Sequence, residues 1–568
     1  MKKPTIFKVF YAAAGLIFCT AVVNAQPPKA LSNAVTDELN RNFGVFAGKG
    51  TPPPYFMSYS VTDINTIMIG ATNGATLSNM HMQTRILDPV MRIGDFVFDN
   101  THLSAGYGSN PISIALDDDY DSIRSSVWIQ MDQLYNNSVE ALRQAKQSKE
   151  TSAEDEFKAD DFSREKPETY SGKSTSLNVD RELWEKRVKE LSAIFKKYPY
   201  IYTSSITLNS QTENRFFVNT EGTKISSGNL RTRLMIYATT KAEDGMDLFK
   251  FESFEAVNTD GLPDMKTIEA KVIQTANDLM ELRGAETIEP FTGPAILSGK
   301  ASGVFFHEIF GHRIEGHRQK SEYEGNTFTA RINQPVLPAI FSVVDDPTMK
   351  KFGEIDLNGA YEYDDEGVKS QRVQLVKNGI LKTFLMSRSP VPGVDKSNGH
   401  GRAQPGNSPV SRQGNLIVQA SKTVSPAELR KLLIAEIKRQ KKPFGLLFDD
   451  ISGGFTNTSR FDTQSFQVTP VMVYKVFADG RPDKLVRGLD LIGTPLTVFS
   501  KIIAADNTSE VFNGMCGAES GWVPVSAISP GILVSQIEVQ KRFKSKESQP
   551  ILPPPGFEVK DWKGGNGK

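Results

Sequence analysis

The chain has 568 residues, 39% of them hydrophobic and 23% charged, which is typical of a globular protein of about two or three domains rather than a disordered or fibrous one. Its 66 basic residues balance 66 acidic ones, so nucleic acid is not expected as a partner, because phosphate binding requires a basic excess. Only the first 25 residues are apolar enough to engage a bilayer, which excludes a protein with several membrane spans.

The N-terminal residues 1–25 have the pattern of an export signal. Two lysines precede a largely apolar stretch at 7–23, and Ala25 is the small residue that a signal peptidase requires. An uncleaved anchor helix is the alternative interpretation. We expect the signal to be removed, which leaves an exported, periplasmic protein without a membrane span.

Residues 26–285 combine helical and strand-like patterns and predict an N-terminal lobe of mixed α and β structure. Within this lobe, residues 148–173 are crowded with charge and poor in large apolar side chains, so we interpret them as a solvated insertion or linker. The expected helices are 37–46, 126–147, 180–198 and 264–282, and the expected strands are 59–62, 91–98, 201–208, 215–219 and 230–238 with a further run from 224.

Proline and glycine at 289–294 end the last of these helices and indicate a domain junction near residue 285. Residues 286–544 are richer in strand patterns and predict a C-terminal catalytic lobe with antiparallel sheets. Residues 545–568 are rich in proline and glycine and predict a mobile tail. The expected fold class is therefore α+β with two lobes.

Two local signals in the second lobe are specific. Asn378-Gly379 between apolar flanks predicts a two-residue hairpin turn. Ser425, followed by proline and by glutamate three residues on, predicts the start of a helix that ends near 441. Strands are expected at 445–448, 466–477 and 484–491.

Three of the six histidines fall close together, and two of them form the pattern His307-Glu308-x-x-x-His312 on a helix that Ser298 can cap. Zinc proteases with the shorter H-E-x-x-H pattern place two histidines one turn apart on one helix face. A spacing of five residues instead separates the two side chains by about 140° on a regular helix. They converge only if the helix contains a π-bulge or is unwound, and Gly311 lowers the cost of such a distortion.

Two histidines do not complete a catalytic zinc site, which has three protein ligands and a water. Once the signal is removed, Cys516 is the only cysteine, so it is buried filler, a nucleophile or a metal ligand. Its glycine-rich surroundings predict a loop, which favours function. We interpret Cys516 as the third ligand and Glu308 as the base that activates the zinc-bound water. His317, expected on the solvated surface, and Glu315 are alternative ligands, and a polar helix face without metal is the remaining interpretation.

The sequence resembles the TldD/PmbA family of zinc-dependent peptidases. The similarity includes the histidine motif with Ile314-Glu315-Gly316 after it, the stretch 365–381, and the segment 514–517, and it continues to about residue 540. In the first half only residues 219–222 and the general layout match. The resemblance is therefore specific across roughly half of the chain.

The resemblance implies one zinc ion per chain, held by His307, His312 and Cys516, with Glu308 in the catalytic position. It also implies unfolded peptides as substrates, threaded as an extended strand beside the metal, where main-chain pairing gives affinity with little sequence demand. Family members commonly form heterodimers with a TldE/PmbA-like paralogue that lacks the metal motif, and a homodimer is the alternative. This chain keeps the motif and so resembles the metal-binding TldD-type subunit, although its predicted signal and charged insertion depart from the family pattern.

The expected function is thus zinc-dependent hydrolysis of unfolded peptides by a metal-activated water. Two other functions fit part of the pattern. Cys516 paired with a histidine would make a thiol hydrolase. A periplasmic peptide-binding module with a structural zinc would need four protein ligands.

Overall fold

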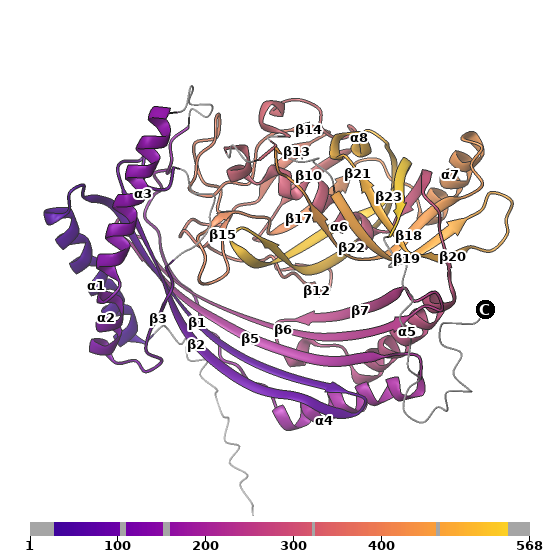
Figure 1. The fold of residues 1–568 in the computed structure, drawn as a ribbon, viewed down its shortest axis with the longest axis horizontal. Coiled ribbons are helices and arrows are strands. Elements are labelled where there is room, and N and C mark those ends of the chain that lie inside the picture. Colours follow the sequence, from indigo (N-terminus) through magenta and orange to yellow (C-terminus); the bar gives the residue numbers. More distant parts are fainter. Residues whose placement is uncertain are drawn as a thin grey trace, which may run out of the picture.

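The computed structural model describes residues 28–102, 110–151, 159–320, 324–325, 327–461 and 466–542. The predicted signal at 1–25 and the predicted tail at 545–568 lie outside these ranges and stay predictions. The described part consists of two lobes, each built on its own sheet (Figure 1). In that part of the chain no helix combines the length and the apolar character needed to cross a membrane.

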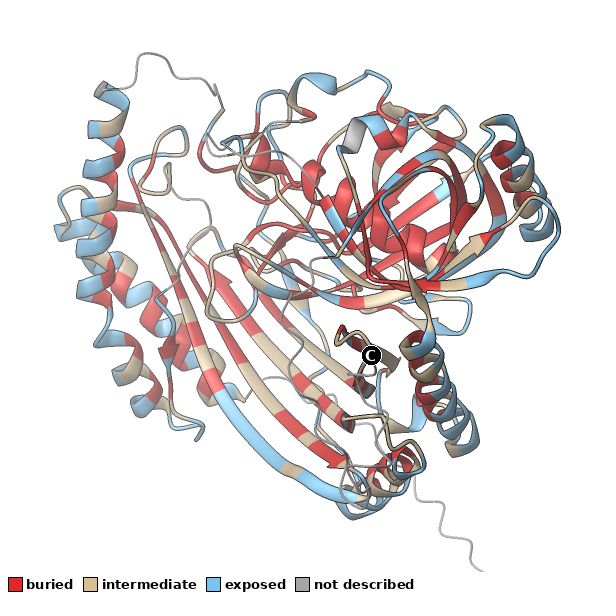
Figure 2. Cartoon of the chain, turned by 45° about the vertical axis from the view of Figure 1, so that its right-hand side comes forward, coloured by how far each residue is buried: buried red, intermediate tan, exposed pale blue. Residues whose placement is uncertain are grey.

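The first lobe is a long, curved, mainly antiparallel sheet with helices at its two ends (Figure 1). Its strands are β1 (Pro54–Thr72), β2 (Ala75–Ile93), β3 (Ile112–Ser113), β4 (Thr169–Ser171), β5 (Thr203–Asn219), β6 (Lys224–Lys241) and β7 (Asp247–Ala256), and its helices are α1 (Lys29–Lys49), α2 (Tyr120–Trp128), α3 (Met131–Thr151), α4 (Arg181–Ala193) and α5 (Met265–Gly284). The strand order is β3-β2-β1-β5-β6, with both β4 and β7 bonded to β6. β2 lies at the sheet's outer edge and is exposed over its first half (Figure 2).

Local signals predicted several of these elements. Asp180 and Asp264 cap α4 and α5 by accepting hydrogen bonds from the backbone N–H groups three residues on. The strands expected at 201–208 and 215–219 form one continuous strand, β5. The single helix expected at 126–147 is divided instead, since α2 ends at Trp128 and α3 begins at Met131. β7 was not predicted.

The interpretation of residues 148–173 as a solvated insertion is wrong for part of that segment. Asp161, Phe162 and Ser163 are almost completely buried. The Phe162 ring packs against Phe56 of β1, and the carbonyl of Ser163 accepts a hydrogen bond from Arg388 of the second lobe. The high charge of the whole segment predicted exposure, although residues 161–163 pack between the lobes.

The second lobe is a large mixed sheet that surrounds helix α6 (Figures 1 and 2). Its helices are α6 (Gly299–Ile309), α7 (Pro426–Arg439) and α8 (Pro495–Phe499), and its strands are β8 (Glu286–Thr287), β9 (Phe291–Leu297), β10 (Phe341–Asp345), β11 (Lys351–Phe352), β12 (Ile355–Asp356), β13 (Val373–Lys377), β14 (Ile380–Leu381), β15 (Gly401–Arg402), β16 (Val410–Ser411), β17 (Asn415–Ala420), β18 (Gly445–Thr456), β19 (Phe466–Val476), β20 (Lys484–Arg487), β21 (Leu489–Gly493), β22 (Ile502–Ala518) and β23 (Gly521–Lys541). The order of the main path is β14-β13-β10-β17-β23-β9-β18-β19-β20-β8, and most neighbours are antiparallel. The predicted fold class, α+β with antiparallel sheets, is therefore confirmed.

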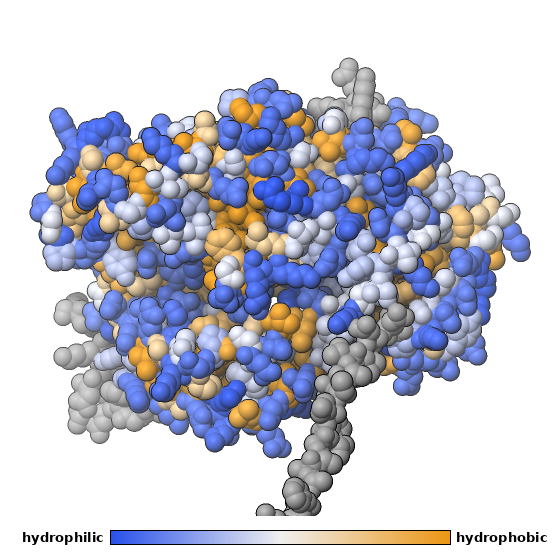
Figure 3. Space-filling view, turned by 180° about the vertical axis from the view of Figure 1, so that it is seen from behind, coloured by the Kyte–Doolittle hydropathy of each residue, from blue (hydrophilic) through white to orange (hydrophobic). Residues whose placement is uncertain are grey.

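The two specific signals of this lobe are also confirmed. Asn378 and Gly379 both have positive φ, 50° and 80°, and join β13 to β14. Ser425 caps α7 by accepting a hydrogen bond from the Glu428 N–H. On the rear face of the molecule, hydrophilic residues predominate and apolar residues show in patches between them (Figure 3).

Candidate metal centre

Helix α6 carries the first half of the histidine motif into the core of the second lobe. Ser298 caps the helix as predicted, and every residue from Ala301 to Ile309 is buried. The helix ends at Ile309, and residues 311–314 form a 3₁₀ turn. Any Cβ on Gly311 would clash with the side-chain amide of Gln413. A larger residue at this position would have to displace the buried Gln413 side chain. The chain unwinds here, and this unwinding repositions His312.

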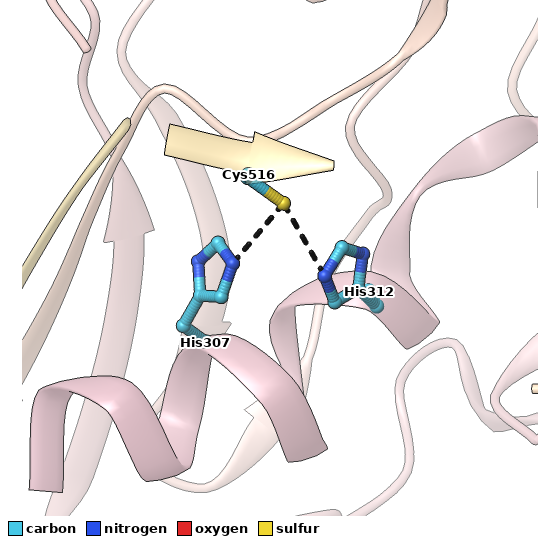
Figure 4. A group of neighbouring side chains, drawn as sticks. All are labelled: His307, His312 and Cys516. Carbon is cyan, nitrogen blue, oxygen red and sulfur yellow. Dashed lines mark hydrogen bonds between the residues drawn. The ribbon is translucent and has the colours of Figure 1, made fainter. Parts of the chain in front are cut away.

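His307, His312 and Cys516 converge on one point (Figure 4). The Cys516 Sγ lies 3.3 Å from His307 Nε2 and 3.4 Å from His312 Nε2. The three candidate ligand atoms all lie within 4.8 Å of one another, and all three side chains are buried. Zinc bonds of about 2.0–2.3 Å in a tetrahedral arrangement are compatible with these separations. The donor set and its geometry therefore fit a zinc ion with one position left for water.

The predicted loop around Cys516 is instead a β-hairpin. Cys516 lies near the end of β22, and its backbone pairs with Val523 of β23. Gly514 and Gly517 resemble loop residues in the sequence. A Cβ on Gly514 would lie 2.7 Å from the Phe512 ring, and one on Gly517 would lie 3.1 Å from the Trp522 ring. Glycine in a strand gives such rings room. Cys516 is thus held on a rigid element.

Glu308 lies beside this group, with its Oε2 atom 3.9 Å from His312 Nε2. Burial raises the pKa of its carboxyl above the ordinary value, against the opposing effect of the two histidines. The carboxyl faces a cavity of about 500 Å³ that also contains the three candidate ligands. The rest of the lining is Val304, Arg318, residues 452–456, Thr458, Phe512, Met515, residues 517–519, Trp522 and Val525.

The cluster favours a thiolate at Cys516. Burial alone would raise the pKa of Cys516, but His312 and His307 outweigh it, so the pKa lies well below the ordinary value. Conversely, burial would lower the pKa of both histidines, and the neighbouring Cys516 charge reverses the direction. Thiolate is the form of cysteine that binds metals.

His317 and Glu315, the alternative ligands, do not join the group formed by His307, His312 and Cys516. His317 was expected on the solvated surface, and that prediction is wrong, because its side chain is only 12% exposed and its Nε2 lies 3.6 Å from a carboxylate oxygen of Glu519. Glu315 is completely buried. Its Oε2 lies 3.2 Å from His312 Nδ1, the ring nitrogen that faces away from Cys516.

Two arginines that the sequence analysis missed hold the Cys516 hairpin. Arg412 donates hydrogen bonds to the carbonyl of Cys516 and to the hydroxyl of Ser520. Arg318 forms a two-point contact with Glu519 at the hairpin turn, at 2.6 and 2.8 Å. Arg318 follows the histidine motif closely enough to attract notice, whereas no local pattern marks Arg412.

The second lobe is similar in sequence to known metalloproteases. Residues 291–541 match the model of the PmbA/TldA metallopeptidase C-terminal domain. A metalloprotease of Methanocaldococcus jannaschii is 25% identical over 329 residues, which cover 57% of this chain and 67% of that protein. A zinc metalloprotease TldD homologue of Saccharolobus solfataricus is 24% identical over 251 residues, covering 43% of this chain and 51% of that protein.

The fold of the whole chain also has a counterpart. The crystal structure of TldE from Thermococcus kodakarensis superposes with a TM-score of 0.58 at 14% identity, covering 89% of this chain and all of that one. This likeness extends the shared fold to both lobes. On the evidence of the matched region, residues 291–541 of this chain are similar to the PmbA/TldA metallopeptidase C-terminal domain.

Proposed function

We propose that this chain is a zinc-dependent peptidase that hydrolyses unfolded peptides with Glu308 as its general base. The observation that carries the proposal is the convergence of His307, His312 and Cys516 next to a buried carboxyl that opens onto a cavity. Three protein ligands with a free fourth position are typical of catalytic rather than structural zinc.

The residues around the site divide the chemistry between them. Zinc bound at this site would polarise the scissile carbonyl and lower the pKa of a water molecule. The Glu308 carboxylate accepts the proton of the attacking water and then donates it to the amine of the leaving peptide.

The wall of the cavity supports an extended peptide as substrate. β18 pairs with β9 only over Leu446–Phe448. Its later residues, 452–456, line the cavity and have β19 as their one strand partner within the described residues. A peptide in extended conformation would add to the edge of β18 through its main chain, which requires little of its side chains.

The assembly and location belong to the same proposal. We infer that the chain pairs with a TldE-like subunit, supported by the shared fold of the Thermococcus TldE, and that a homodimer is the alternative. The signal pattern of residues 1–25 supports export to the periplasm.

Cleavage of an unstructured peptide by the purified, zinc-loaded protein tests the function. Glu308→Gln should lower kcat by at least about 100-fold, the range of general-base effects, while zinc binding stays close to wild type. Glu281→Gln, an exposed change of the same kind on α5, should leave the rate unchanged. Full activity of folded Glu308→Gln would refute the proposal.

The same assay distinguishes the zinc enzyme from a thiol hydrolase, for which the 3.3 Å contact between Cys516 and His307 is the favouring observation. A zinc peptidase loses activity with a chelator and regains it with added zinc. A thiol hydrolase keeps its activity with the chelator and loses it on alkylation of Cys516.

A further inference from the structure

Glu315 is a buried charge placed directly behind a candidate metal ligand. It lies between two 3₁₀ turns, residues 311–314 and 316–319, and its side chain is completely buried. Its Oε2 lies 3.2 Å from His312 Nδ1, whereas His312 Nε2 faces Cys516 at 3.4 Å. A carboxylate only accepts hydrogen bonds, so Nδ1 donates and carries the ring proton. The lone pair of Nε2 is then left for a metal.

The same carboxylate contacts two buried arginines. Arg318 Nε donates to Glu315 Oε2 at 2.9 Å, and Arg412 Nε lies 3.6 Å from Glu315 Oε1. The Arg412 side chain is completely buried. A buried carboxylate is tolerated in a fold when such charges compensate it. The two arginines therefore fix the orientation of the carboxylate that faces His312.

Each arginine also reaches the hairpin that carries Cys516. Arg412 donates to the Cys516 carbonyl at 2.6 Å, and Arg318 donates to Glu519 at the turn of the hairpin. Glu315 thus contacts His312 on one side and both arginines on the other, and each arginine contacts the Cys516 hairpin. His312 and Cys516 are 204 residues apart in the chain, so these contacts connect ligands that the backbone does not.

We propose that Glu315 is a positioning residue of the metal centre. It holds His312 in the tautomer and orientation that direct Nε2 to the metal, and through Arg318 and Arg412 it sets the distance between His312 and Cys516. The inference rests on the proposed zinc site and assigns Glu315 a role other than that of a ligand. Carboxylates behind ligating histidines typically change metal affinity by about 10- to 100-fold when they are mutated.

Zinc affinity of the full chain, measured by competition with a chromogenic chelator, tests this role without reference to activity. Glu315→Gln should raise the zinc Kd by about 10- to 100-fold and change the d–d and thiolate bands of the cobalt-substituted protein. Glu315→Asp keeps the charge but withdraws it from His312, so it should also weaken zinc binding. Glu324→Gln is the matched control, because Glu324 likewise accepts from Arg318, at 2.6 Å, and its affinity should stay within about 3-fold of wild type.

The outcomes are separable. Absence of zinc from the wild-type protein would refute the proposed function itself. Wild-type Kd and cobalt spectra in folded Glu315→Gln or Glu315→Asp would overturn the inference. Loss of fold in both variants, judged by circular dichroism while Glu324→Gln folds normally, would also overturn it, since Glu315 would then act in folding. An equal loss of affinity in Glu324→Gln would place the effect at Arg318 and overturn the direct role at His312.

Discussion

Gly454 lies so close to Glu308 that a Cβ at this position would stand 2.5 Å from the Glu308 Cγ. The cavity wall formed by β18 therefore has glycine where the carboxyl requires room. A substitution at Gly454 should therefore move the Glu308 carboxylate without changing any of the three candidate metal ligands.

We predict that Gly454→Ala displaces Glu308 and lowers peptidase activity by at least about 10-fold, since small misplacements of catalytic groups carry large rate losses. Zinc content should stay near wild type, because the three atoms nearest to the added Cβ all belong to Glu308. Activity and zinc content measured on the same preparation check the prediction. Gly453→Ala, next to it, is not a clean control because Gly453 has a φ of 153°. Gly48→Ala, on the surface helix α1 with open space around its Cα, serves instead and should leave both quantities unchanged.

A second prediction concerns the ligand set. Cys516→Ser and His312→Ala should each reduce zinc from about one ion per chain, as expected for a three-ligand catalytic site, to a small fraction of that content. His81→Ala, a change at an exposed histidine of β2, should keep the zinc. Chelation of the wild type should lower its melting temperature. A free zinc concentration of about 1,000 times the Kd stabilises the folded protein by about 4 kcal/mol, and the chelator removes this contribution. Unchanged melting on chelation would contradict the assignment.

The parts of this structure that the sequence predicted are those with local causes. The hairpin at Asn378-Gly379 follows from two residues that tolerate positive φ, and the first turn of α7 follows from its capping serine. The unwinding before His312 was likewise expected from the five-residue spacing of the histidines and from Gly311.

The parts that the sequence did not predict depend on contacts between distant segments. Gly514 and Gly517 suggested a loop, yet they lie in β22 because their backbones pair with β23. Arg412 lies 104 residues from Cys516 in the chain, and its hydrogen bond to the Cys516 carbonyl forms only in the folded protein. His317 was assigned to the surface because nothing nearby in the sequence reveals Glu519 as its neighbour.

A third prediction concerns the charge cluster between the lobes. Lys250 of β7 donates to Asp450 of β18 at 2.9 Å, and Lys300 of α6 lies 3.0 Å from the same carboxylate. Burial would raise the pKa of Asp450, but the two lysines outweigh it and lower the pKa below its ordinary 3.8. The carboxylate therefore stabilises the fold fully above that ordinary value, and this stabilisation is lost as the pH falls through the lowered pKa.

Asp450→Asn should lower stability at neutral pH by less than the roughly 3–5 kcal/mol that an unpaired buried charge costs, because Lys250 keeps Asp278 at 3.3 Å and Glu252 at 3.5 Å. A paired carboxylate loses its contribution to stability between about pH 5 and about pH 1. The free energy of unfolding should therefore fall less over this range in the variant than in the wild type. Thermal melting across pH measures both effects. Asp483→Asn, which breaks the more exposed pair with Arg430, should cost at most about 1 kcal/mol. Equal effects of the two substitutions would show that the cluster does not hold the lobes together.

A fourth prediction tests the buried part of the charged segment. The Phe162 ring is 3% exposed and lies between the guanidinium groups of Arg92 and Arg388, at 3.7 and 3.8 Å from its centre. Arg92 belongs to the first lobe and Arg388 to the second, so the ring packs where the lobes meet. Phe162→Ala should destabilise the protein by about 3–5 kcal/mol through lost packing and the cavity left behind.

Chemical denaturation of Phe162→Ala beside Trp128→Ala measures this contribution. Trp128 is 57% exposed, so its removal should change stability by no more than about 0.5 kcal/mol. Limited proteolysis should also cut Phe162→Ala faster near residue 160, because the segment loses the ring that holds it between the two arginines. Wild-type stability and wild-type proteolysis in Phe162→Ala would mean that the segment around Phe162 does not contribute to the packing of the lobes, as its high charge had suggested.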